Sequence, residues 1–317
     1  MLWKKIKRYL PFIGIILFVY LLIKLNVIEI LKQIVTANKL YLIVALSLVL
    51  FYLLFQTLKW HVLAKKQKIP ILFLESLKIN LMSDFYGLIT PGQLGTVIRV
   101  EYLKKYSNVG KGISNFVIDK VFSLISLFFI VLLLGFIVLR EKLDWLNGLT
   151  FVYGIIIFLF FIGLFLFFYN TKRSKFLLKI IYRKFIPQRM KEKAKETFHS
   201  FYEDLPKKQF LIEVFFLHII AWIINSAIVY LVALSLGINI KFIYFIAIYF
   251  IAVLVAQIPI TINGLGTREA TLILLFGLFG ILDKVKIFSM SLISIFLMGV
   301  FPALIAIFFI LKERKSK

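Results

Sequence analysis

Cysteine is absent from the 317 residues, and histidine occurs only three times. The lack of thiols excludes disulfides, thiolate metal sites and cysteine nucleophiles. His61, His199 and His218 show neither an HExxH spacing nor a close pair, so the sequence predicts no zinc site. We therefore expect no metal and no cofactor.

Acidic residues are scarce as well. Fifteen Asp and Glu stand against 39 Lys and Arg, which gives a formal net charge of +24. Such an excess can indicate nucleic-acid binding. However, 62% of the residues are hydrophobic and the mean hydropathy is +0.97, the composition of an integral membrane protein. We expect membrane lipids as partners, anionic or phosphate-bearing, and no nucleic acid.

Long apolar runs supply the candidate membrane spans. A helix needs roughly 20 residues to cross about 30 Å of hydrocarbon. The sequence has no alternating ten-residue segments of the kind found in membrane barrels, so helices are the expected spanning elements. The N-terminus lacks the small-residue cleavage site of a signal peptide and is interpreted as an uncleaved first helix. The candidate spans are 10–28, 40–58, 71–90, 113–139, 149–169, 210–236, 241–260, 265–281 and 287–311.

Basic residues indicate which ends of the spans face the cytoplasm. The predicted cytoplasmic loop 171–209 holds twelve basic and four acidic residues, and both termini are basic. The span 40–58 brings the chain back inside at Lys59, the first residue of another basic cluster. A hairpin over 71–112 that enters and leaves from the cytoplasm keeps every basic cluster inside. The same reasoning makes 241–282 a hairpin from the outer side.

The predicted fold is an all-α integral membrane protein of the cell membrane, with both termini cytoplasmic. One polytopic domain covers 1–317, with about six full transmembrane helices and two oppositely oriented re-entrant helical hairpins. The first repeat spans about 40–139 with its hairpin at 71–112, and the second spans about 210–311 with its hairpin at 241–282. The helices that flank the two hairpins run in opposite directions, so the copies form an inverted repeat.

Each hairpin carries a glycine-rich turn at its tip, and we expect the two tips to meet. "ITPGQLGTVIRVE" (Ile89–Glu101) and "ITINGLGTREA" (Ile260–Ala270) share Ile-Thr and Leu-Gly-Thr at equal spacing. Glycine permits a tight turn, and the N–H groups of the helix that follows attract anions such as phosphate. Thr96 and Thr267 are candidate N-caps of these helices. The residues assigned to the backbone of the tips are Pro91, Gly92, Gly95, Asn263, Gly264 and Gly266.

Charged residues follow each turn. An arginine at the centre of a span costs about 2.5–3.5 kcal/mol, so Arg99 and Arg268 suggest that an anionic group visits. The alternative is an internal ion pair, of Arg268 with Glu269 and of Arg99 with Glu101 or Asp84. The candidate residues for binding a lipid head group are Arg99, Arg268, Glu269, Asp119, Lys120, Asp84, Glu101, Thr96 and Thr267. The candidate cavity-lining residues are His218, Asn225 and Gln257, with interhelical hydrogen bonding as the alternative role.

The sequence resembles the lysylphosphatidylglycerol synthase transmembrane-region family, the flippase-like membrane domain of multiple peptide resistance factors and their stand-alone relatives. "TPGQLGTVIRVEYLKK", "NFVIDKVFSL" and "PITINGLGTREATL" carry the resemblance, which covers essentially the whole chain. The family's first motif has an acid where this chain has Thr96, and its second has an arginine where this chain has Lys120. The two changes either compensate each other or leave Glu101 to supply the carboxylate. The resemblance implies the movement or handling of aminoacylated, hopanoid or isoprenoid-linked lipids.

The leading hypothesis is a lipid translocase, flippase- or scramblase-like, that binds an anionic or phosphate-bearing head group between the tips. One alternative is a membrane-embedded lipid-modifying transferase or its accessory subunit. The sequence disfavours an enzyme, because it has no long hydrophilic domain and no metal or nucleophile motif. The other alternative is an ion-coupled small-solute transporter. The lipid, the direction and energy source of its movement, and any homo-oligomer or partner enzyme are left open.

Overall fold

The computed structural model describes residues 14–90, 93–142, 208–258 and 261–315, with the isolated positions 152, 155, 156 and 159. The predicted span 149–169 and the predicted loop 171–209 lie almost entirely outside these residues. The tip residues Pro91 and Gly92 also lie outside them.

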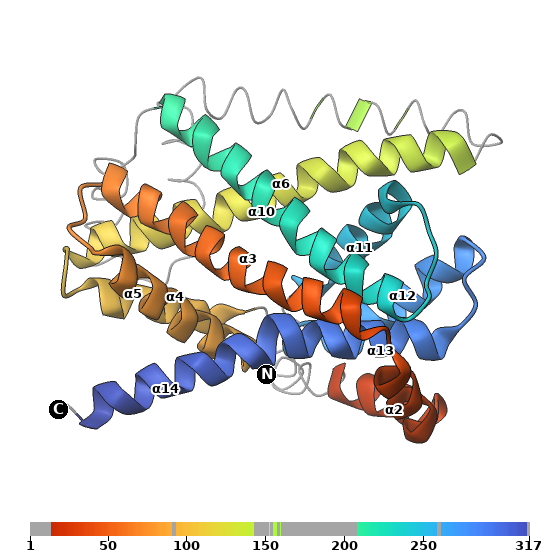
Figure 1. Cartoon of the computed structure of the whole chain (residues 1–317). Helices are drawn as coiled ribbons and strands as arrows, with labels where there is room; N and C mark the ends of the chain where they lie inside the picture. The colour runs from red at the N-terminus through yellow and green to blue at the C-terminus, as the bar shows by residue number, and fades with distance from the viewer. Residues whose placement is uncertain are drawn as a thin grey trace, which may run out of the picture.

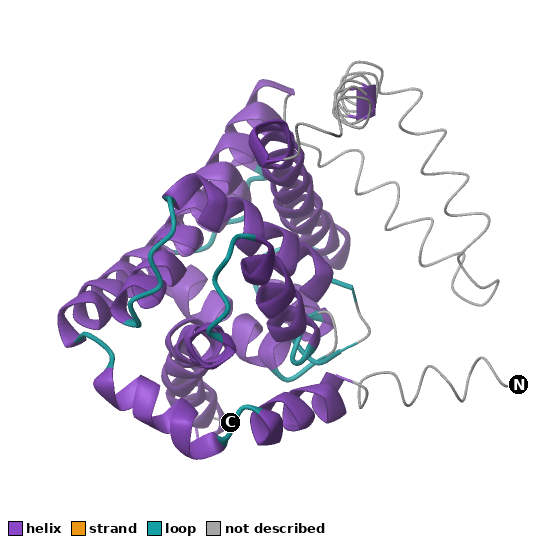
Figure 2. Cartoon of the chain, turned by 90° about the vertical axis from the view of Figure 1, so that its right-hand side faces the viewer, coloured by secondary structure: helices purple, strands orange, loops and turns teal. Residues whose placement is uncertain are grey.

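The described elements are helices joined by short loops (Figure 2). A short helix, Gly14–Lys24, comes first. The remaining helices are α2 (Val27–Thr36), α3 (Lys39–Lys66), α4 (Phe73–Leu88), the 3-10 helix η1 (Leu94–Val97), α5 (Ile98–Leu103), α6 (Val109–Lys142), α10 (Lys208–Ser235), α11 (Phe242–Ala256), α12 (Thr267–Leu278), α13 (Lys284–Ile295), the π-helical turn η4 (Phe296–Val300) and α14 (Phe301–Lys315).

Four of the described helices are long and apolar enough to cross a membrane. They are Lys39–Lys66, Val109–Gly135, Phe210–Ser235 and Lys284–Lys312, the last of which runs through α13, η4 and α14. Gly14–Lys24 and α2 together make a fifth candidate span if this bent pair is counted as one. The chain is thus a multi-pass membrane protein with four to five candidate spans. The six full spans and the re-entrant character of the hairpins stay predictions.

The first predicted span, 10–28, is wrong at its C-terminal end. The helix that begins at Gly14 ends at Lys24, and α2 leaves it at an angle of 80°. Asn26 makes the break: its φ is 63°, and its side chain accepts a hydrogen bond from the Ile28 N–H (3.0 Å). Asparagine tolerates the left-handed region and caps a new helix, which an apolar run alone does not reveal.

Basic residues mark one end of the four long helices, although Lys39 opens α3 and Lys284 opens α13 at the other end. The C-terminal ends of α3 and α14 and the N-terminal ends of α6 and α10 all lie on the left of Figure 1. Lys65 and Lys66 close α3, Lys111 lies in the first turn of α6, and Lys312 lies near the end of α14. Basic residues gather on the cytoplasmic side of membrane proteins, so this end is the expected cytoplasmic one.

The two predicted hairpins lie at opposite ends of the bundle. α4 and α5 lie together on the left of Figure 1, where α4 packs against both η1 and α5. α11 and α12 lie together towards the right and pack against each other. Their tips touch: Gln93 Nε2 donates a hydrogen bond to the side-chain oxygen Oδ1 of Asn263 (3.3 Å), across 170 positions of sequence.

The tips require an unusual backbone. Gln93 (φ 56°) and Asn263 (φ 48°) both adopt the left-handed region that non-glycine residues seldom occupy. At Gly95 a Cβ atom would lie 2.1 Å from the Tyr86 carbonyl oxygen, because η1 folds directly back onto α4. Gly264 combines a φ of 74° with equally little room, 2.3 Å from the Cβ of Ala256. The glycines therefore set how closely each tip folds onto its own hairpin.

Replacing Gly95 with alanine is expected to destabilise the protein by more than the about 1–3 kcal/mol typical of overpacking, because the obstacle is backbone. Gly277→Ala is the matched control, since a Cβ there meets nothing within 4 Å and α12 gains a better helix former. Thermal unfolding of the protein in detergent measures both. Equal melting temperatures for the two variants would show that the first tip is not packed this way.

Candidate functional site

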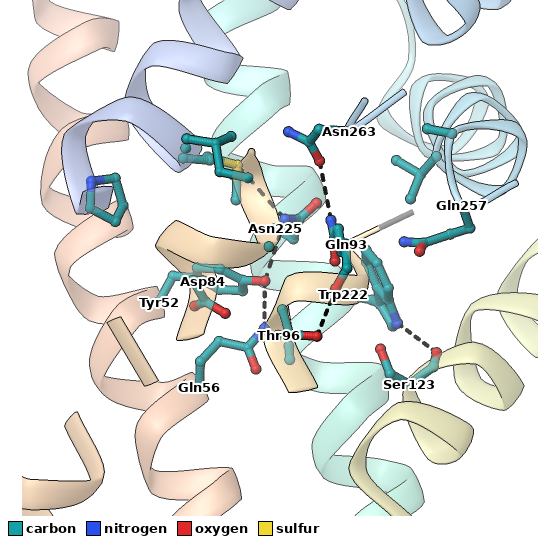
Figure 3. Close-up of a pocket in the computed structure, with 18 of the residues that line it drawn as sticks. Tyr52, Gln56, Asp84, Gln93, Thr96, Ser123, Trp222, Asn225, Gln257 and Asn263 are labelled. Atoms are coloured by element: carbon teal, nitrogen blue, oxygen red, sulfur yellow. Dashed lines mark hydrogen bonds between the residues drawn. The ribbon is translucent and has the colours of Figure 1, made fainter. Parts of the chain in front are cut away.

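A cavity of about 520 Å³ lies where the two tips meet. α3, α4, α6, α10, α11, α12 and the turn η4 contribute to its walls (Figure 3). Its lining includes ten of the residues singled out from the sequence: Asp84, Thr96, Arg99, Asp119, Lys120, His218, Asn225, Gln257, Asn263 and Arg268. Segments far apart in the chain therefore converge on one polar space inside an apolar bundle.

Asp119 of α6 is the centre of a buried ionic network. Its Oδ2 accepts a hydrogen bond from Arg99 Nη1 (2.9 Å), and its Oδ1 lies 3.4 Å from Lys59 Nζ. His218 Nε2 lies 3.2 Å from the same Oδ1. The second terminal nitrogen of Arg99 donates to Asn80 Oδ1 (2.6 Å). One carboxylate thus ties α3, α5, α6 and α10 together.

The guanidinium of Arg99 lies over an aromatic ring. It lies 4.9 Å from the centroid of the Trp60 ring, a cation–π distance. Trp60 Nε1 in turn donates to Asn115 Oδ1 (2.6 Å), and Asn115 donates to Gln67 Oε1 (2.9 Å). Arg99 is only 4% exposed, and its Nε has no hydrogen-bond partner among the described residues. The side chain is therefore a fixed part of the wall.

His218 has an acceptor at each ring nitrogen. Nδ1 lies 2.8 Å from the Val214 carbonyl, and Nε2 faces Asp119. A neutral imidazole has only one N–H to donate. The ring satisfies both contacts as a donor only when it carries a proton on each nitrogen, in which case it adds a third positive charge around Asp119.

The tip of the second hairpin is organised around Glu269, which is completely buried. Its Oε2 accepts a hydrogen bond from the Gly266 N–H (2.6 Å), and its Oε1 accepts from Ser291 (2.6 Å) and from Arg268 Nη2 (3.0 Å). The Arg268–Glu269 ion pair is the arrangement that the sequence offered as an alternative to binding of an anionic ligand by Arg268. The carboxylate occupies the N-terminus of α12, so the anion at that helix end belongs to the chain itself.

Two expectations about the tips are therefore wrong. Thr267 is the first residue of α12, not its N-cap; Gly266 holds that position and Glu269 supplies the capping oxygen. Thr96 lies inside η1, where its hydroxyl donates to the Gln93 carbonyl (2.8 Å), and Val97 is the N-cap of α5. Threonine before a charged helix suggested a cap, but the N-cap lies one residue earlier in α12 and one residue later in α5.

Arg99 does not pair with the partners proposed from sequence. Glu101 is exposed and forms an ion pair with Lys104. Residues two apart on a helix point in different directions, so burying Arg99 turns Glu101 away from the cavity. Asp84 lines the cavity but makes no ion pair with Arg99. The true partner, Asp119, lies 20 residues further along the chain.

Two charged side chains face the cavity without a fixed partner. Asp84 and Lys120 make neither a hydrogen bond nor an ion pair with any other described residue. Arg268 also lines the cavity, and Nε and Nη2 are the atoms that it uses on Glu269. Lys120, Asp84 and Arg268 are therefore the groups best placed to meet a ligand.

Neutral polar groups cover the remaining wall. Tyr249 donates to Asn225 Oδ1 (2.8 Å), and Gln56 donates to the Tyr52 hydroxyl (2.5 Å). Trp222 Nε1 donates to the Ser123 carbonyl (3.0 Å; Figure 3). Gln257 and Asn225 thus lie in the cavity wall. Within the described residues, no group of three or more His, Asp or Glu side chains is arranged to hold a metal ion.

Sequence reasoning missed several of these residues. Lys59 was assigned to the cytoplasmic basic cluster, but α3 continues to Lys66 and leaves Lys59 only 6% exposed beside Asp119. Its spacing was a usable signal: Lys59 stands six residues before the paired Lys65 and Lys66, almost two helical turns deeper. Asn80 and Tyr249 carry no such signal, since their roles depend on which helices meet.

The chain is similar to known proteins along most of its length. The model of the family described as "Lysylphosphatidylglycerol synthase TM region" matches residues 11–306. The chain belongs to this family. Two UPF0104 membrane proteins of Methanocaldococcus jannaschii are related to it. One is 27% identical over 269 residues, which cover 80% of this chain and 79% of the relative; the other is 26% identical over 245 residues, 74% and 99% respectively.

Membership of the lysylphosphatidylglycerol synthase transmembrane-region family is compatible with a lipid-related role in a membrane. The matched residues include those that line both halves of the cavity, because the match runs from before α2 to within α14. The tip segments, Asp119 and Arg268 all lie inside the matched range. The cavity is therefore made entirely from the part of the chain that the family shares.

Replacing Asp119 with asparagine is expected to destabilise the protein by about 3–5 kcal/mol, because Arg99 and Lys59 would stay buried without a counter-charge. Glu101→Gln removes an exposed partner and should change stability by less than about 1 kcal/mol. Unfolding in mixed detergent micelles measures both free energies. A similar loss for the two variants would mean that Asp119 is not the centre of the network.

Proposed function

We propose that this protein is a lipid translocase, flippase- or scramblase-like, whose cavity receives the phosphate of a lipid head group. The observation that carries the proposal is the charge of the cavity wall, where four Lys and Arg side chains stand against two carboxylates in the lining and a third, Glu269, behind Arg268. Charge without compensation at membrane depth is costly and marks a functional site in most membrane proteins. An anionic group that enters this space lowers that cost.

The network around Asp119 favours Lys120 and Arg268 as the first contacts of that anion. Arg99 and Lys59 are 4% and 6% exposed and already face Asp119. Lys120 has no fixed partner among the described residues. Arg268 uses only Nε and Nη2, one edge of its guanidinium, in its hydrogen bonds to Glu269. Lys120 stands where the family has an arginine. The lysine favours a single contact of its ammonium group with phosphate, whereas an arginine would favour a bidentate one.

The size of the cavity favours a head group over a whole lipid. Pockets for small ligands range over about 300–1,000 Å³, and this one is about 520 Å³. The acyl chains of a bound lipid would stay among the exposed apolar side chains of the bundle. The lipid head group could then cross the membrane inside the protein while the acyl chains stay in the hydrocarbon of the bilayer.

The membrane arrangement that belongs to this proposal has six full spans and two re-entrant hairpins, with both termini in the cytoplasm. α4–α5 would enter from the cytoplasmic side and α11–α12 from the outer side. Their opposite placement in the bundle and the contact between their tips support an inverted repeat. In such repeats the ligand binds near the midplane and the two halves rock about it.

The contact between Gln93 and Asn263 is then a barrier that must open. Their side chains meet over 3.3 Å at the edge of the cavity. A single long hydrogen bond contributes on the order of 1 kcal/mol, which is weak enough to break during each cycle. The tips thus provide a contact that closes the path in one state and separates in another.

Reconstituted vesicles test the proposal directly. The purified protein should speed the movement of fluorescent phosphatidylglycerol between leaflets, measured by chemical quenching of the outer leaflet. Lys120→Gln and Arg268→Gln should each lower the initial rate at least tenfold, about 1.4 kcal/mol of lost binding. Lys284→Gln, an exposed change at the start of α13, is the control.

Two results would contradict the proposal. The first is a wild-type protein that moves none of a broad panel of phosphate-bearing lipids. The second is full activity in both cavity variants. Uptake of a small solute along a proton or sodium gradient, with no lipid movement, would support the ion-coupled transporter instead.

The absence of cysteine makes the tip contact directly testable. A Gln93→Cys/Asn263→Cys variant, bridged by a short bis-maleimide, should lose lipid transfer because the tips can no longer separate. Each single variant treated with the same reagent should stay active. Undiminished transfer in the fully cross-linked double variant would show that the tips need not part.

A further inference from the structure

A second hollow, of about 230 Å³, lies outside the cavity described above. Its walls come from α4, from the segment at the end of α5, and from α14. None of its lining residues also lines the larger cavity. It is therefore a separate feature of the side on which α4, α5 and the C-terminal end of α14 lie (Figure 1).

Three lysines from three parts of the chain line this hollow. They are Lys78 of α4, Lys105 after α5 and Lys312 of α14. The only carboxylate in the lining is Glu75, which pairs with Lys78 at 2.5 Å. The charge of the lining is therefore +2, and an anion placed between the three segments would reduce their mutual repulsion.

The rest of the lining is apolar or aromatic. Ile79 and Met82 of α4 and Phe309 of α14 contribute hydrocarbon, while Tyr102 and Tyr106 contribute rings with a polar edge. Tyrosine favours the boundary between hydrocarbon and water, and lysine extends its ammonium group towards lipid phosphates. The combination suits a molecule that is apolar at one end and anionic at the other.

The neighbouring surface of α14 indicates a lipid rather than a soluble anion. Leu304, Phe308 and Leu311 are more than half exposed on the same helix that supplies Phe309 and Lys312. In a helix that spans a membrane, such a face lies against acyl chains. The hollow thus joins a lipid-facing surface to a group of lysines at the end of the helix.

We propose that this hollow binds the phosphate group of an anionic membrane lipid, with Lys105 and Lys312 on the phosphate and the lipid chains along α14. The bound lipid bridges the first hairpin to the last long helix. It occupies a site of its own and does not depend on translocation through the larger cavity.

Native mass spectrometry of the full chain, released from nanodiscs of phosphatidylcholine and phosphatidylglycerol, tests this site. Wild-type protein should retain phosphatidylglycerol preferentially. A Lys105→Gln/Lys312→Gln variant should bind it at least tenfold more weakly. The control is Lys284→Gln/Lys286→Gln, which removes the same charge at the start of α13 and should retain the lipid like the wild type.

Three results would overturn the proposal. They are equal retention in the two double variants, no preference for phosphatidylglycerol over phosphatidylcholine in the wild type, and displacement of the lipid by millimolar inorganic phosphate. The last would identify a soluble anion as the ligand. Thermal unfolding of the Lys105→Gln/Lys312→Gln variant without lipid should match the wild type, because Lys105 and Lys312 are exposed side chains.

A cavity variant separates this site from the translocation path. Lys120→Gln lowers lipid transfer under the proposed function but leaves phosphatidylglycerol bound at the second hollow. Loss of that bound lipid in Lys120→Gln would mean that the two sites are one. Failure of translocation with retention intact would remove the proposed function and leave this inference standing.

Discussion

The carboxylate of Asp119 is the interaction on which this structure most depends. It lies within 3.4 Å of cationic or titratable groups from three other helices, deep in a protein that has few acids. Low local dielectric makes each of these attractions strong and makes the loss of their common partner expensive. The position of α5, the orientation of Arg99 and the shape of one cavity wall all follow from that single group.

The second half of the molecule binds its arginine with a neighbouring residue of α12, supported by one serine of α13. Glu269 neutralises Arg268, caps α12 and accepts a bond from Ser291, so its site is nearly self-contained. The first half instead needs α3, α4, α6 and α10 to hold Arg99. Two related sequence motifs thus produce one arginine that is locked in the wall and another that still reaches the cavity.

Composition and charge were sufficient to predict an all-helical, multi-pass membrane protein and the chain positions of its two turns. Local rules also offered the Arg268–Glu269 ion pair as one of two roles for Arg268, because the two residues are neighbours. They could not identify Asp119 as the partner of Arg99 or place Lys59 beside it, since both depend on how α3, α5 and α6 pack. The break at Asn26 was missed for a different reason: hydropathy averages over the single polar residue that ends one helix and starts the next.

The π-helical turn η4 divides the last long helix into two parts with different neighbours. α13 packs against α2 and α12, whereas α14 packs against α4. A turn that holds an extra residue rotates the side chains beyond it by about 100° relative to an uninterrupted α-helix. The same span can therefore present one face to the second hairpin and a differently phased face to the first. The extra residue of the π-helical turn thus lets one helix pack against both hairpins, each on a differently oriented face.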